Sequence, residues 1–161
     1  MNRPASLLLT AIAFDLYWTL VVLFRERGLF IWLALAILCW LRLPPEYRAS
    51  ALLLAAAGCG LDTIWALSGL VDFNGDTLLP LWMAALWLMF AVVWIRLICA
   101  ATLPGWLLAL ATAFGGPTAY LLGAYLGAMT LLAPTAAVFG AMACGWLAMM
   151  LVFHMVMGRR Q

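Results

Sequence analysis

LLLAAAGCGLDTIWALSGLV, residues 52–71, contains a single acidic or basic side chain, that of Asp62. A transmembrane helix needs about 20 predominantly apolar residues. The stretch therefore predicts a membrane-spanning helix with a carboxyl group near its centre. A charged Asp at that depth costs about 2.5–3.5 kcal/mol on insertion scales, so an intramembrane carboxyl requires a partner and is a candidate functional group.

The composition of the whole chain agrees with a membrane protein. Hydrophobic residues make up 69% of the 161 residues and charged residues 9%, whereas soluble domains have about 25% charged residues. We therefore expect a single transmembrane domain over residues 1–161. The formal net charge is only +2, and the arginines form no basic patch, so the sequence excludes nucleic acid as a partner.

The few polar interruptions divide the chain into apolar runs. Each run is long enough, or nearly long enough, to cross a bilayer as an α-helix. The sequence therefore predicts an all-α, polytopic, six-helix transmembrane bundle, with helices at about 6–24, 28–43, 49–71, 79–98, 105–128 and 132–157.

The arginines predict the orientation of this bundle. With six helices both termini lie on one side, and that side collects six of the eight arginines, Arg3, Arg42, Arg48, Arg96, Arg159 and Arg160. Cytoplasmic loops carry the excess of basic residues, so we expect cytoplasmic termini. The first apolar run continues past the signal-peptide-like Ala11–Ala13 to Phe24, which indicates an uncleaved first helix.

Three features fall at similar depth in this arrangement: Asp15 in the first helix, Asp62 in the third, and Gly116-Pro117 in the fifth. Proline has no N–H, so Pro117 deprives the Ala113 carbonyl of its helical partner. The sequence therefore predicts a fifth helix broken at Gly116-Pro117. Non-helical backbone at membrane depth is tolerated where it faces protein or a cavity, so the break predicts a polar site near the midplane.

The role of this polar cluster has two interpretations. Burial and mutual repulsion disfavour two charged carboxylates, so we expect at least one of Asp62 and Asp15 to be neutral. A neutral carboxyl donates as well as accepts and could hold helices together, or it could form a proton or ligand site. Trp65, three residues after Asp62, and Tyr120, one turn after Pro117, are the polar side chains expected nearby.

Small residues recur at every fourth position of the last two predicted helices, namely Gly115, Ala119, Gly123 and Gly127, then Ala136, Gly140, Cys144 and Ala148. Such stripes allow close helix contact in lipid. The pattern predicts packing and leaves open whether the contact lies within the chain, in a homo-oligomer or with a membrane protein partner.

Patterns typical of cofactor, metal or catalytic sites are absent from the sequence. Asp72–Asp76, DFNGD, resembles the start of a calcium loop but lacks the following glycine and the distal glutamate. His154 is the only histidine, so no Ser/His/Asp set exists. We therefore expect no cofactor and no metal, assign no catalytic residue, and favour a protein that is not an enzyme.

Three segments resemble a bacterial inner-membrane family, Domain of Unknown Function 2878. They are GLDTIWALSGLVDF, PLWMAALWLMFA and GGPTAYLLGAYLGAM, with the matching positions Gly60 and Asp62, Pro80 through Phe90, and Gly116 through Ala128. The resemblance implies a multi-pass protein of the bacterial inner membrane and hints at an association with fatty-acid-modifying enzymes. Where this family tends to carry a polar stretch with Asn and His, the chain has Val92–Arg96.

These observations favour a membrane protein that binds or passes a small, largely apolar, lipid-derived ligand through a polar midplane site. A proton-coupled transporter that uses Asp62 and Asp15 is one alternative. A non-catalytic scaffold for a lipid-modifying enzyme is another. Membrane lipid is an expected partner in every case.

Overall fold

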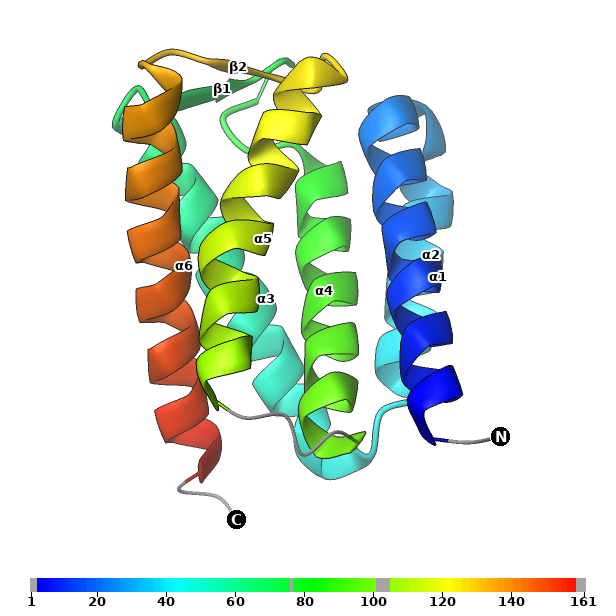
Figure 1. Ribbon diagram of the computed structural model, residues 1–161. Coiled ribbons are helices and arrows are strands. Elements are labelled where there is room, and N and C mark those ends of the chain that lie inside the picture. The colour runs from blue at the N-terminus through cyan, green and yellow to red at the C-terminus, as the bar shows by residue number, and fades with distance from the viewer. Residues whose placement is uncertain (1–2, 76, 101–104, 159–161) are drawn as a thin grey trace. The chain divides into compact units, whose positions relative to one another are not determined.

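A computed structural model describes residues 3–75, 77–100 and 105–158. It is almost entirely helical (Figure 1). The elements in chain order are α1 (Arg3–Phe24), η1 (Arg25–Gly28), α2 (Leu29–Leu41), α3 (Pro45–Leu67), β1 (Val71–Phe73), α4 (Leu81–Ala100), α5 (Gly105–Tyr125), β2 (Met129–Leu131) and α6 (Thr135–Gly158).

The chain divides into two compact units, which are described separately. The first comprises Met1–Cys59 and Pro80–Thr102, and the second comprises Gly60–Leu79 and Leu103–Gln161. The first unit therefore holds α1, η1, α2, most of α3 and α4. The second holds the end of α3, the two short strands, α5 and α6.

The number of membrane-spanning segments corrects the prediction of six. Among the described residues, five helical segments are long and apolar enough to cross a membrane, and the first of them, Ser6–Leu41, combines α1, η1 and α2. The helix α2 has only 13 residues, about 20 Å at 1.5 Å per residue, whereas the hydrocarbon core is about 30 Å thick. The protein is thus a multi-pass helical membrane protein, but α2 is too short to count as an independent span.

Two indoles hold the turn between α1 and α2. Trp32 Nε1 donates to the Arg25 carbonyl at 3.0 Å, and Trp82 Nε1 of α4 donates to Glu26 Oε1 at 3.0 Å. Arg25 adopts a left-handed φ of 45°, a conformation that a non-glycine residue adopts only when its surroundings require it. The Tyr17 hydroxyl donates to the Trp32 carbonyl at 3.0 Å, and after the η1 turn both α1 and α2 pack on α4.

The turn from α2 to α3 depends on Arg48. Its Nη2 donates to the Leu41 carbonyl at 2.6 Å and its Nε donates to the Leu43 carbonyl at 3.1 Å. In return, Trp40 Nε1 donates to the Arg48 carbonyl at 3.0 Å. A cation at a helix C-terminus satisfies carbonyls that lack a helical partner, which explains why α2 ends at Leu41 and not at the predicted residue 43.

Helices α3 and α5 end in the same way, at a glycine with positive φ. After α3, Gly69 has φ +72°, and after α5, Gly127 has φ +73°. The Leu70 N–H bonds to the Trp65 carbonyl at 3.0 Å, and the Ala128 N–H bonds to the Gly123 carbonyl at 2.9 Å. These are Schellman ends, and they shorten the predicted helices 49–71 and 105–128 to Leu67 and Tyr125.

The segments that follow Gly69 and Gly127 form a small antiparallel ribbon in the second unit. In it β1 pairs with β2 in the register Val71↔Leu131, Asp72↔Thr130 and Phe73↔Met129. Asn74 extends the ribbon, since its Nδ2 donates to the Gly127 carbonyl at 3.1 Å and its Oδ1 accepts from Thr130 at 3.0 Å. The sequence did not predict the two strands.

The predicted break at Gly116-Pro117 is wrong, because α5 is one helix from Gly105 to Tyr125 with Pro117 inside it. Proline removes one hydrogen bond but fixes φ near −65°, which is compatible with a helix. Transmembrane helices tolerate such residues because neighbouring groups satisfy the freed backbone. In the second unit α5 packs along α6.

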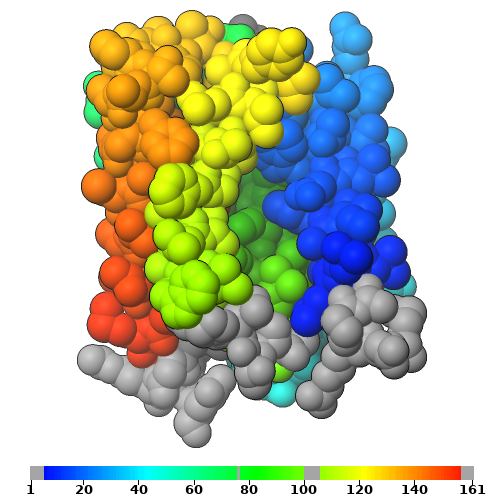
Figure 2. Space-filling view, in the orientation of Figure 1, coloured from blue at the N-terminus to red at the C-terminus, as the bar shows by residue number. Residues whose placement is uncertain are grey.

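The outer faces of the helices are apolar. On α1 they carry Leu8, Leu9, Ile12 and Leu16, and on α6 they carry Leu151, Val152 and Met155, all exposed. Figure 2 shows the side chains of α1 in blue and those of α6 in orange to red on the surface. Water would penalise this much exposed apolar surface, whereas lipid accommodates it.

Candidate functional site

The second unit contains a fully buried carboxyl. Asp62, near the end of α3, is 0% exposed, and the Tyr120 hydroxyl of α5 donates a hydrogen bond to its Oδ1. Tyr120 is itself buried, with 5% of its surface exposed. Asp62 therefore points toward α5, where its partner is a side chain three residues beyond Pro117.

Aromatic rings fill the space between the end of α3 and the two helices beside it. The rings of Trp65 and Tyr120 meet edge to face, with centroids 5.3 Å apart. A Cβ placed on Gly145 of α6 would lie 2.9 Å from the Trp65 ring, and one placed on Gly116 of α5 would overlap the Trp146 ring. Gly116 therefore serves close packing of α6 against α5.

The Asp62–Tyr120 pair lies nearer the helix ends than predicted. Asp62 is five residues before Leu67, the last residue of α3, and Tyr120 is five residues before Tyr125, the last residue of α5. Five helical residues correspond to about 7.5 Å. The pair therefore lies below the β1–β2 ribbon, because Gly69 and Gly127 end the helices earlier than the apolar pattern suggests.

Asp15 does not share this buried environment. It belongs to the first unit and its side chain is exposed. The Thr19 hydroxyl, one turn after Asp15, donates to the Asp15 backbone carbonyl at 2.8 Å. Of the predicted site residues, the structure thus groups Asp62, Trp65, Tyr120, Gly116 and Pro117 in one unit and places Asp15 in the other.

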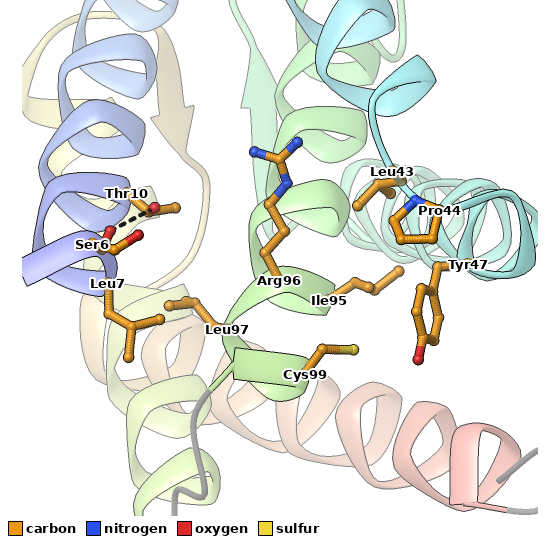
Figure 3. Close-up of a pocket in the computed structure, with 10 residues that line it drawn as sticks. All are labelled: Ser6, Leu7, Thr10, Leu43, Pro44, Tyr47, Ile95, Arg96, Leu97 and Cys99. Atoms are coloured by element: carbon orange, nitrogen blue, oxygen red, sulfur yellow. Dashed lines mark hydrogen bonds between the residues drawn. The ribbon is translucent and has the colours of Figure 1, made fainter. Parts of the chain in front are cut away.

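The first unit contains a pocket that the sequence did not predict. It has a volume of about 370 Å³ and lies where α1 begins, α3 begins and α4 ends (Figure 3). It is lined by Ser6, Leu7, Thr10, Leu43, Pro44, Tyr47, Ile95, Arg96, Leu97 and Cys99. Ligand sites are typically concave and mostly apolar, with a few polar groups that fix orientation, and this lining has that character.

The polar groups of this pocket are spread along it. In Figure 3 the Arg96 guanidinium lies between Thr10 and Leu43, while the Tyr47 ring and the Cys99 thiol lie beyond Ile95. The Thr10 hydroxyl donates to the Ser6 carbonyl at 2.9 Å, which leaves its oxygen free to accept. The pocket therefore offers one cation, hydroxyl groups and apolar walls.

One signal in the sequence pointed toward the pocket. Arg96 is the only charged residue in the apolar run of α4, and it lies in the stretch Val92–Arg96 that departs from the family pattern. The other lining residues come from three segments far apart in the chain, and no periodicity links them. Among the residues that the structure describes, no group of three His, Cys, Asp or Glu side chains could hold a metal ion.

Comparison with known proteins agrees with the resemblance noted in the sequence. Neither a curated protein nor a solved structure matches the chain. A family model described as "Protein of unknown function (DUF2878)" matches residues 7–152. That match covers both units of the fold, so the chain belongs to the DUF2878 family.

Proposed function

We propose that this protein binds a small, largely apolar, lipid-derived ligand and that the pocket of the first unit is the binding site. The observation that supports this is the 370 Å³ pocket between α1, α3 and α4, whose lining includes the apolar Leu7, Ile95 and Leu97 as well as the hydroxyl residues Thr10 and Tyr47. This site replaces the midplane site predicted from the sequence.

The position of the pocket suits a ligand that comes from the bilayer. Arg96 lies four residues before the end of α4, about 6 Å along the helix. An arginine at this depth reaches the interface with its guanidinium while its methylenes stay among apolar groups. We propose that this end of the unit, with Arg42, Arg48 and Arg96, faces the cytoplasm of a bacterial inner membrane, as the positive-inside rule expects.

Filling the pocket tests this proposal. Leu97→Trp places an indole in the cavity, whereas Leu16→Trp places one on the exposed face of α1, where Leu16 is 61% exposed. Native mass spectrometry of each purified variant should show a co-purifying lipid-derived ligand with the wild type and Leu16→Trp and none with Leu97→Trp. Equal ligand occupancy in all three, at equal thermal stability, would contradict the proposal.

A second candidate function is proton-coupled transport, and the buried carboxyl of Asp62 favours it. Intramembrane carboxyls recur in the proton relays of transporters. Asp62→Asn keeps an acceptor for Tyr120 but cannot release a proton. Under this hypothesis the variant folds and binds ligand normally, yet proteoliposomes that contain it show no uptake driven by a pH gradient. Unchanged uptake would leave Asp62 with a packing role.

A scaffold for a lipid-modifying enzyme is the third possibility from the sequence. The small residues of α6 favour it, since Ala136, Gly140, Cys144 and Ala148 are all exposed in the chain. A scaffold predicts that cross-links from Cys144 reach a second membrane protein or a second copy of the chain.

A further inference from the structure

We infer that the pocket of the first unit binds the anionic head group of an amphiphile, with the Arg96 guanidinium as its counter-ion. This inference rests on the proposed function and specifies the chemistry of the ligand. It starts from the charge balance of the ten lining residues.

Among the lining residues that the structure describes, Arg96 is the only one with a permanent charge, and none carries a carboxylate. Within the described residues, 3–75, 77–100 and 105–158, no carboxylate forms an ion pair with it. A guanidinium stays protonated and offers five donors in a fixed fork. That fork matches carboxylate and phosphate oxygens, often through two parallel hydrogen bonds. The site is therefore suited to an anion and repels a cation.

The volume of the pocket limits what can enter. A water molecule occupies about 30 Å³ of liquid, so the 370 Å³ of the pocket hold roughly a dozen non-hydrogen atoms. This is enough for a carboxylate or phosphate head and the first carbons of a chain. The remaining chain has to leave the pocket.

The apolar part of the lining provides a path for that chain. Leu7 of α1 and Leu97 of α4 border the pocket, so a chain that leaves the head group meets apolar side chains first. Apolar surface buried by a chain there contributes about 25 cal/mol per Å². Head group and chain would thus be recognised by adjacent parts of one unit.

Titration with matched twelve-carbon probes tests the inference. The purified protein in an uncharged detergent is titrated with dodecanoate, dodecyl phosphate, dodecanol, dodecyltrimethylammonium and inorganic phosphate, and Kd values are measured by native mass spectrometry. We expect the two anionic amphiphiles to bind at least tenfold more tightly than the alcohol and the cation. Inorganic phosphate should bind far more weakly than dodecyl phosphate.

Arginine variants identify the counter-ion. Arg96→Gln should abolish the tenfold preference for the anions, and Arg96→Lys should retain part of it, which also shows that the pocket is folded. Arg27→Gln is the control, because Arg27 is an exposed arginine that does not line the pocket, and it should behave as the wild type. An unchanged preference in Arg96→Gln would overturn the inference.

The outcomes separate this inference from the function on which it rests. Equal binding of dodecanol and dodecanoate, blocked by Leu97→Trp, would overturn the anion site and leave the lipid-binding proposal intact. Equal affinity for inorganic phosphate and dodecyl phosphate would show that the site binds free anions and would overturn the inference that its ligand is an amphiphile. Dodecanoate binding unaffected by Leu97→Trp would overturn both.

Discussion

Asp62 and Tyr120 form a pair in which each side chain satisfies a polar group of the other. An unpaired polar group in an apolar environment costs several kcal/mol, and Asp62 is entirely buried. The Tyr120 hydroxyl supplies a donor, while its ring packs on Trp65. One tyrosine thus provides both the hydrogen bond and the aromatic contact that hold α3 against α5.

Replacing Tyr120 by Phe tests the hydrogen bond without removing the ring. The variant removes the hydroxyl that donates to the buried Asp62 carboxyl oxygen. Loss of a donor to a buried group costs about 1–3 kcal/mol, whereas measured hydrogen bonds between membrane helices average about 0.6 kcal/mol. We expect the unfolding free energy, measured by titration with sodium dodecyl sulfate, to fall by about 1 kcal/mol.

The control for this substitution is Tyr125→Phe, because Tyr125 is 88% exposed and loses no buried contact. Its unfolding free energy should stay within about 0.5 kcal/mol of the wild type. Equal losses in the two variants would show that the Asp62–Tyr120 bond does not stabilise the fold.

At the scale of elements, α5 and α6 pack by fitting a large ring onto a glycine. The Trp146 ring occupies the space that a side chain of Gly116 would need. The neighbouring Gly115 has no atom of another element within 4 Å of its Cβ position. Two adjacent glycines of one helix therefore have opposite surroundings.

This contrast predicts opposite effects of alanine at the two positions. Gly116→Ala should destabilise the protein by about 1–3 kcal/mol through overpacking. Gly115→Ala should be neutral or stabilising by up to about 1 kcal/mol, since alanine is the better helix former. Unfolding titrations of the two single variants measure the difference. If Gly116→Ala is as stable as Gly115→Ala, the close contact with Trp146 is not part of the fold.

At the scale of the whole molecule, the arginines and the ends of α3 predict the orientation in the membrane. Glu46 lies in the first turn of α3, and Asn74 lies beyond its other end, in the ribbon. We expect Asn74 on the periplasmic side and Glu46 on the cytoplasmic side, in accordance with the positive-inside rule.

Single cysteines at these positions test the orientation in a background without Cys39, Cys59, Cys99 and Cys144. A membrane-impermeant maleimide added to intact cells should label Asn74→Cys, and it should label Glu46→Cys only after lysis. The reverse pattern would invert the topology and place the Arg96 pocket on the outer face.

Much of this architecture could be predicted from the sequence, because the apolar runs are long. The burial of Asp62 and its orientation toward the fifth helix followed from the cost of an unpaired carboxyl in lipid. The helix ends at Gly69 and Gly127 could not be placed, since apolar residues surround both glycines and hydropathy does not register a change in φ.

The pocket and the aromatic packing could not be predicted, because they depend on contacts between distant segments. Gly116 was assigned to a helix break, and nothing in the sequence indicates that Trp146, thirty residues later, covers it. The small-residue pattern also includes Gly115, whose Cβ position has no atom of another element within 4 Å. Residue spacing along one helix identifies a face but not the side chain that meets it.

The short helix α2 has a consequence for how the protein is made. Its 13 residues are too few to leave the translocon as an independent stop-transfer segment. Trp32 and Trp82 bind Arg25 and Glu26 of η1, the turn that joins α1 to α2. Helix α2 also packs along α4, which is synthesised later. Insertion of α2 during biogenesis therefore depends on α1, and its final position is fixed only after α4 has emerged from the ribosome.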